Sequence, residues 1–198
     1  MGATGRMGRL VAELVKSDPE VELATDEADI WIDFSTPEGT QKAIALGKPL
    51  VCGTTGLPDS VLKELHTLSE KVPVLYAPNF SLGIALAVKM LNALTPHLKV
   101  FSTIKIDETH HRHKKDAPSG TALSLSLLLG TDQIESHRVG EVVGTHQITL
   151  NLPNETLTLT HEALSRKAFA QGALEAAKFI FNKPAKLYSL DDLDFATF

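Results

Sequence analysis

Apolar side chains in the first part of the chain alternate between helical and strand-like spacing. Met7, Leu10, Val11 and Leu14 recur at intervals of three and four residues, which predicts a helix that Pro19 ends. Short apolar runs bounded by turn-forming residues predict strands at 21–24, 29–34, 49–52 and 72–76, with helices from 37 and from about 58 to 70 between them. This alternation predicts βαβ units and a parallel sheet.

The pattern changes after Asn79, where alternation with a period of two residues appears. The elements predicted there are a helix at 84–94, a strand at 99–107, a helix at 121–129, two alternating strands at 146–152 and 156–161, and a last helix at 171–181. The two alternating strands are joined by a short Pro-Asn-Glu segment, so we expect an antiparallel hairpin. The second part of the chain is therefore predicted to be α+β.

Composition narrows the class of protein. The chain has 198 residues, 43% hydrophobic and 22% charged, which is typical of a globular protein with one large or two small domains. Its net charge of −5 argues against a nucleic-acid partner. A single cysteine, Cys52, and the lack of a secretory signal or of any apolar run near the length of a membrane helix lead us to expect a cytoplasmic protein without a membrane partner.

Glycines mark two candidate phosphate-binding turns. Gly2, Gly5 and Gly8 open the first helix, where backbone N–H groups and the helix N-terminus favour a pyrophosphate, although a tight turn alone explains them equally well. Only Met1 precedes them, so the strand expected before this motif is missing, as it would be if Met1 were an internal methionine of a longer reading frame. Asp26 is the candidate for the adenosine ribose, and the turn 53–56 follows a buried strand.

The segment 108–121 carries the densest chemistry. Three histidines, one arginine and two lysines occur within residues 110–115, which predicts attraction of a small anion. Ser119-Gly120-Thr121 opens a helix whose N–H groups and hydroxyls would bind a carboxylate, with a lysine to stabilise charge and a histidine to donate a proton. Two alternatives stay open, a zinc site built on His111 and His113 and a solvated charged surface.

Taken together, these segments resemble the dihydrodipicolinate reductase family. The resemblance lies in Gly-Ala-Thr-Gly-Arg-Met-Gly at 2–8, Ile-Asp-Phe-Ser-Thr-Pro-Glu-Gly-Thr at 32–40, Gly-Thr-Thr-Gly at 53–56, Ala-Pro-Asn-Phe-Ser at 77–81, and Glu-Thr-His-His-Arg-His-Lys-Lys-Asp-Ala-Pro-Ser-Gly-Thr-Ala at 108–122. The segments 139–146 and 161–172 extend it over most of the chain. The last of the five motifs is highly specific to that family.

The resemblance implies hydride transfer from NADH or NADPH to a cyclic, unsaturated dicarboxylate in lysine biosynthesis through diaminopimelate. In it, His110 corresponds to the proton donor and Lys114 to its partner, while His111, Ser119, Gly120 and Thr121 correspond to substrate-binding positions. The positions that correspond to coenzyme contacts are Gly2, Ala3, Thr4, Gly5, Arg6, Met7, Phe34, Gly53, Thr54, Thr55, Ala77, Pro78, Asn79 and Phe80, to which the spacing argument adds Asp26. The resemblance implies no metal.

The same resemblance implies a fold and an assembly. We expect an α/β chain with a Rossmann-like nucleotide-binding domain at 1–80 and 167–198, and an α+β domain at 81–166 with a mixed or antiparallel sheet that binds substrate and forms a homotetramer. The stretch 24–29 is shorter than in the family, and so is the connection after Leu129. A catalytically impaired relative that binds a dicarboxylate but no nicotinamide nucleotide is therefore the alternative.

Overall fold

The computed structural model describes residues 1–24 and 27–195. The chain divides into two compact units, one formed by residues 1–82 together with the segment from Arg166 onward, and one formed by Gly83–Ser165. The polypeptide therefore leaves the first unit once and returns to it through its C-terminal segment.

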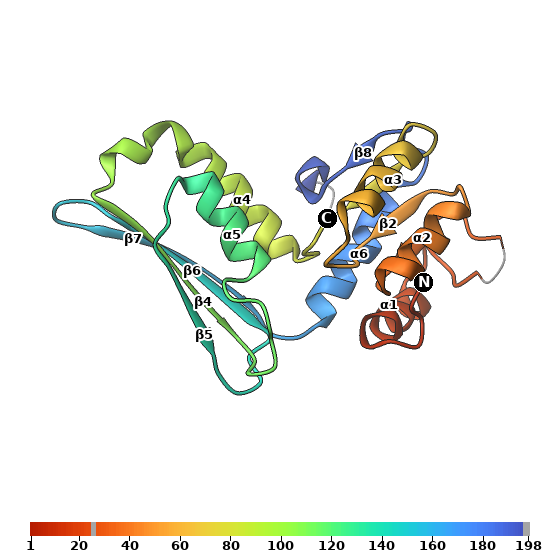
Figure 1. Cartoon of the computed structure of the whole chain (residues 1–198), viewed down its shortest axis with the longest axis horizontal. Helices are drawn as coiled ribbons and strands as arrows, with labels where there is room; N and C mark the ends of the chain where they lie inside the picture. Colours follow the sequence, from red (N-terminus) through yellow and green to blue (C-terminus); the bar gives the residue numbers. More distant parts are fainter. Residues whose placement is uncertain (25–26, 196–198) are drawn as a thin grey trace. The chain divides into compact units, whose positions relative to one another are not determined.

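The first unit is built on a four-stranded parallel sheet with helices on both faces (Figure 1). Its strand order is β1 (Trp31–Asp33), β2 (Leu50–Cys52), β3 (Val74–Tyr76) and β8 (Leu187–Tyr188). The helices are α1 (Arg6–Ser17), α2 (Pro37–Ala45), α3 (Asp59–Ser69) and α6 (Lys167–Ile180), and a 3-10 turn, Leu190–Asp192, follows β8. This is the arrangement of a Rossmann-like domain.

Two apolar clusters hold the helices of this unit against the sheet. Val11 and Val15 of α1 pack with Ala170 and Leu174 of α6, together with Ile32 of β1. On the other face, residues of α2 and α3 cover side chains of β2 and β3. Because β2 and β3 are covered on both faces, β2 consists entirely of buried apolar residues, and so do the first two residues of β3, as is typical of parallel strands.

The second unit is a mixed sheet with two helices on one face (Figure 1). Its elements are α4 (Leu82–Leu94), a 3-10 helix at Thr95–Val100, β4 (Thr103–His110), α5 (Gly120–Leu129), β5 (Ile134–Arg138), β6 (Gly144–Asn151) and β7 (Thr156–Ala163). The strand order is β5-β4-β6-β7, with β4 and β5 parallel and the other two pairs antiparallel. Side chains of α4 and α5 form one core with Ile106, Ile148 and Leu150.

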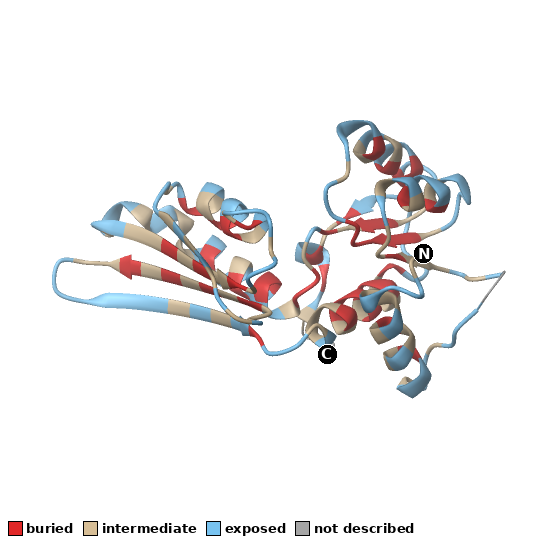
Figure 2. Cartoon of the chain, turned by 60° about the horizontal axis from the view of Figure 1, so that its bottom comes forward, coloured by how far each residue is buried: buried red, intermediate tan, exposed pale blue. Residues whose placement is uncertain are grey.

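Burial alternates along β4 and β6, so each strand has an inner and an outer face (Figure 2). The inner face meets α4 and α5 and contains Ile106, Glu108 and His110 of β4. The outer face of this sheet contains half-buried polar side chains such as Thr145 and Thr149. The register of the sheet therefore decides which charged residues lie in the interior of the unit.

The predicted fold class is confirmed, and several elements lie where the pattern placed them. The hairpin forms as β6 and β7, and Thr36 caps α2 with Pro37 in its first turn. The strand predicted at 21–24 was wrong, because Val21 packs on the α1–α6 cluster and the segment pairs with no strand of the described chain. The strand predicted from Lys99 starts at Thr103.

Two strands were not predicted, β5 and β8. β5 reads Ile-Glu-Ser-His-Arg, whose polar side chains hide its pairing with β4, and β8 has only two residues. No helix in the described part of the chain is both long and apolar enough to cross a membrane.

Candidate active site

A buried carboxylate and a buried histidine lie side by side on the inner face of β4. Glu108 is fully buried and His110 is 8% exposed, and the two-residue spacing of a strand brings both to the same face. Glu108 Oε2 hydrogen-bonds His110 Nδ1. Among the described residues no hydrogen bond is found at Nε2 of this ring, which lies beside Gly144.

Arg138 of the neighbouring strand β5 holds the other oxygen of this carboxylate. Its Nη2 donates to Glu108 Oε1 at 2.8 Å, and the backbone N–H of Ser119 donates to the same oxygen at 3.2 Å. Burial raises the pKa of Glu108, but the hydrogen bonds with Arg138 and His110 help to outweigh burial and lower it to about 2. Glu108 is therefore an anion at neutral pH despite its burial.

The N-terminus of α5 lies next to this pair. Ser119 is the N-cap, and its Oγ accepts from the backbone N–H of Ala122 at 3.2 Å. The same Oγ lies 3.2 Å from Nε2 of His146, a buried residue of β6. Gly120 and Thr121 lie in the first turn of this ten-residue helix, where the helix dipole favours an anion.

Burial lowers the pKa of three histidines on the inner side of this sheet, His110, His146 and His161. Burial and the charges of His110 and His161 lower the pKa of His146 to about 4. The pKa of His110 is also lowered by burial, while the hydrogen bond and the charge of Glu108 act in the opposite direction. The rings of His110 and His146 meet edge to face, with centroids 5.2 Å apart. His146 is therefore neutral at neutral pH, and Glu108 partly offsets the effect of burial on the pKa of His110.

The loop between β4 and α5 supplies the cations. Lys114 Nζ pairs with Asp116 at 2.8 Å, and Arg138 Nη2 donates to the backbone oxygen of Asp116 at 2.5 Å. Lys114 and His111 are half-buried, whereas His113 is exposed. Lys114 also acts on the His110 ring through its charge. The structure thus brings the predicted catalytic and substrate-binding residues together in one unit.

The glycines at the start of the chain lie against the end of β1. Gly2 has a φ of +73°, and a Cβ there would come within 2.5 Å of the Phe34 carbonyl oxygen. A Cβ on Gly53 would come within 2.2 Å of the Phe34 ring, which itself packs edge to face on Phe80 at 5.5 Å. The helix that follows, α1, has no side-chain cap on its first N–H groups. Glycine at these positions therefore allows the two turns to pack closely against Phe34.

A second buried carboxylate organises this edge of the first sheet. Asp33 is fully buried at the end of β1 and accepts hydrogen bonds from Thr40 at 2.5 Å and Thr54 at 2.9 Å, and from Ser35. Thr54 in turn accepts from the backbone N–H of Ser35 at 2.9 Å. The predicted coenzyme residues that the structure gathers in this unit are Gly2, Ala3, Thr4, Gly5, Arg6, Met7, Phe34, Gly53, Thr54, Thr55, Ala77, Pro78, Asn79 and Phe80. Asp26 lies outside the described residues.

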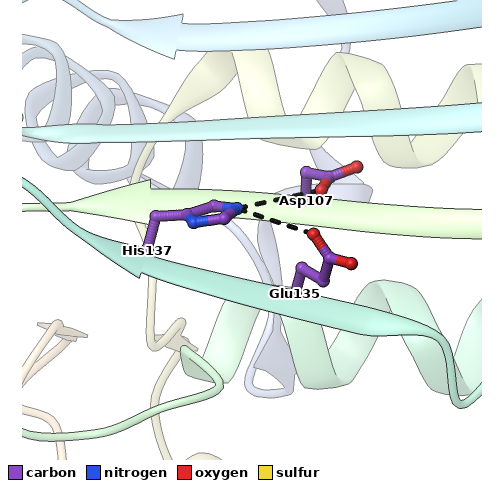
Figure 3. Close-up of side chains that lie close together, drawn as sticks. All are labelled: Asp107, Glu135 and His137. Atoms are coloured by element: carbon purple, nitrogen blue, oxygen red, sulfur yellow. Dashed lines mark ion pairs between the residues drawn. The ribbon is translucent and has the colours of Figure 1, made fainter.

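One group of possible metal ligands occurs among the described residues, on the outer face of the second sheet (Figure 3). Asp107, Glu135 and His137 each offer an atom within 4.8 Å of the others. Lys105 Nζ already pairs with both carboxylates, at 3.2 Å and 3.1 Å. The group includes neither His111 nor His113, the histidines on which the sequence suggested a zinc site. Lys105 thus supplies positive charge next to the Asp107 and Glu135 carboxylates.

Comparison with protein families finds one match for each of the two parts of the chain. Family models described as the N-terminus and the C-terminus of dihydrodipicolinate reductase match residues 22–80 and 83–193. The chain belongs to the dihydrodipicolinate reductase family. Family membership confirms the resemblance found in the sequence motifs.

Curated relatives match along almost the whole chain. A 4-hydroxy-tetrahydrodipicolinate reductase of Campylobacter jejuni is 36% identical, covering 96% of this chain and 96% of its own. One of Thermosipho africanus is also 36% identical, with 98% and 95% covered. Dipicolinate-bound dihydrodipicolinate reductase from Paenisporosarcina sp. TG-14 has the same fold, with a TM-score of 0.79, 22% identity and 97% of both chains covered.

Sequence reasoning missed four residues that build these sites: Asp33, Glu108, Arg138 and His146. A signal existed for Glu108, because it precedes His110 by two residues within a strand-like run. No local signal marked Arg138 or His146, whose roles depend on the pairing of β5 and β6 with β4.

Proposed function

We propose that this chain catalyses the reduction of 4-hydroxy-tetrahydrodipicolinate to tetrahydrodipicolinate by hydride transfer from NADH or NADPH, in lysine biosynthesis through diaminopimelate. The observation that carries the proposal is the match to curated reductases along 96% of the chain. The Glu108–His110 pair beside the N-terminus of α5 supports it, because this pair combines a candidate acid with an anion site.

The proposed substrate site uses residues of the second unit. A substrate carboxylate binds at Ser119, Gly120 and Thr121, at the N-terminus of α5, where the helix dipole favours an anion, and His111 contributes to the same anchor. Lys114 attracts the dianion and stabilises negative charge that develops on it. His110 holds the proton for the carbon next to the one that receives hydride.

The proposed coenzyme site uses residues of the first unit. The N–H groups of residues 2–7 and the N-terminus of α1 would bind a pyrophosphate, because the helix dipole favours an anion there and no side chain caps the helix. Phe34, residues 53–55 and residues 77–80 surround the same turn and would hold and orient the nucleotide. When bound, the nicotinamide supplies the hydride.

The proposal also covers assembly and location. We infer a homotetramer that uses the outer face of the β5-β4-β6-β7 sheet, on which half-buried polar side chains of β4 and β6 lie. We place the protein in the cytoplasm, in keeping with a single cysteine that is buried and reduced.

The decisive test follows oxidation of NADH and of NADPH in separate assays, with substrate generated from pyruvate and aspartate semialdehyde by the upstream synthase. We expect turnover that H110A lowers by about 10²-fold or more with little change in KM. H113A is the matched control, because His113 is an exposed histidine of the same loop. Folded protein that binds pyridine-2,6-dicarboxylate but turns over neither coenzyme would overturn the proposal in favour of a dicarboxylate-binding relative.

A further inference from the structure

We propose that Glu108, held by Arg138, is the positioning residue of His110, and that it keeps the proton of the neutral ring on Nδ1 and so leaves Nε2 without a proton. The inference deepens the proposed function and takes the identity of the reaction from it. The statement about the ring itself is independent of which reaction the protein catalyses.

The two oxygens of Glu108 have different partners. Oε1 accepts from Arg138 Nη2 and from the Ser119 N–H, and Oε2 faces His110 Nδ1. The two donors on Oε1 oppose rotation of the carboxylate. Since an ionised carboxylate only accepts hydrogen bonds, His110 Nδ1 must donate, which leaves Nε2 without a proton in the neutral ring.

Glu108 is also the anion that acts directly on His110. The other charged or titratable groups that face the ring are Arg138 from β5, His146 from β6 and Lys114 from the following loop. His161 of β7 lies behind His146, with ring centroids 6.3 Å apart, and Asp116 is paired with Lys114. The two cations disfavour protonation of His110, as burial does, and Glu108 opposes all three.

Because Arg138 holds Oε1 of Glu108, the effect of the isosteric substitution E108Q can be predicted. In E108Q the amide oxygen must stay with Arg138 and the Ser119 N–H, because both are donors. The amide NH₂ group then faces His110 Nδ1, which has to accept. The substitution therefore moves the proton of the neutral ring to Nε2 and further lowers the pKa of His110.

The first experiment is long-range ¹H–¹⁵N NMR of the full chain labelled at histidine, recorded without substrate or coenzyme. The signals of His110 are assigned by their absence from H110N. We expect the Nδ1–H form in the unmodified protein and in R138K, which keeps the carboxylate, and the Nε2–H form in E108Q. An Nε2–H ring in the unmodified protein overturns the proposal, and this result needs no variant of Glu108 to fold.

The second experiment measures kcat, KM and their pH dependence. E108Q should lower kcat by about 10²-fold at neutral pH with KM nearly unchanged, and should move the alkaline limb of kcat down by about 1 pH unit or more. E155Q, which changes an exposed glutamate in the β6–β7 turn, is the matched control. An unchanged limb in an active E108Q enzyme refutes the positioning role. A chain with the Nδ1–H ring but no turnover refutes only the proposed function.

Discussion

Among the described residues, each unit of this protein contains one fully buried carboxylate, and the two are held in different ways. Asp33 accepts hydrogen bonds from the hydroxyls of Ser35, Thr40 and Thr54, which are neutral at any pH that the fold meets. Glu108 is bonded to Arg138 and His110, a fixed cation and a group that titrates. Equal burial thus accompanies two different electrostatic environments.

The difference shows what each carboxylate does for its surroundings. Asp33 joins the end of β1 to the first turn of α2 and to the turn after β2, so it fixes the backbone of the proposed nucleotide site. Glu108 joins the His110 ring to the N-terminus of α5, so it affects the protonation of this ring as well as its position. A buried carboxylate whose hydrogen-bond partners are neutral stabilises the backbone conformation around it. A buried carboxylate with charged or titratable partners also shifts the pKa of those partners.

Replacing Asp33 should have the largest effect on stability. D33N places an amide NH₂ group among hydroxyl donors and removes a charge that three of them share, so we expect unfolding free energy to fall by about 3 to 4 kcal/mol. D29N, at an exposed aspartate before the same strand, should leave it unchanged. Chemical denaturation measures both. If D33N shifted the pH profile of kcat instead of stability, the contrast between the two carboxylates would be wrong.

The next largest effect concerns pH and His146. Its folded pKa of about 4 lies below the unfolded value of about 6.5, so between these values the unfolded chain binds a proton that the folded chain does not. Stability is therefore lost as pH falls from about 6.5 to about 4, by about 3 kcal/mol from this residue. H146Q should remove that part of the loss, and H97Q, at an exposed histidine, should keep it. Denaturation of the three proteins at both ends of this range measures the slope, and parallel slopes would contradict the prediction.

Glu108 titrates in a separate, lower window. Its folded pKa of about 2 lies below an unfolded value of about 4.3, so its contribution is complete above about pH 4.3 and is lost as pH falls toward 2. The acid limb of a stability profile is thus expected to have two parts, of which H146Q affects only the upper one.

A smaller effect separates two neighbouring threonines. T54V removes one donor to Asp33 and the acceptor of the Ser35 N–H, so unfolding free energy should fall by about 2 kcal/mol. T55V changes an exposed side chain of the same turn and should change stability by less than about 0.5 kcal/mol. Equal losses in the two variants would show that the turn, and not the contact with Asp33, sets the stability of this edge.

The sequence could predict what depends on local spacing. The motif at 108–122 brought His110, Lys114 and Ser119 to one short segment, and the structure places them in one site because a strand, a loop and a helix N-terminus follow each other there. The cap at Thr36 and the hairpin of β6 and β7 are likewise local.

What the sequence could not predict depends on strand order. Arg138 reaches Glu108 only because β5 pairs in parallel with β4, and β5 shows too little apolar alternation to be recognised as a strand. His146 lies opposite Glu108 through the β4–β6 register, about which neither segment carries information alone. At 21–24 the apolar residues indicated a strand, but the segment has no neighbour with which to pair.

The smallest predicted effect concerns the space around Nε2 of His110. It tests whether this space affects kcat separately from the charge next to Nδ1. A Cβ on Gly144 would lie 3.0 Å from His110 Nε2 and 3.2 Å from Cδ2, so alanine must push the ring aside by a few tenths of an ångström without touching Glu108. We expect G144A to lower kcat by about tenfold, or about 1.4 kcal/mol in activation free energy, and to leave the pH limb in place because the partner of Nδ1 is unchanged. T145A, which alters the outer face of the same strand, is the control. A shifted limb in G144A would mean that ring position and protonation cannot be separated here, and that Glu108 controls both through one contact.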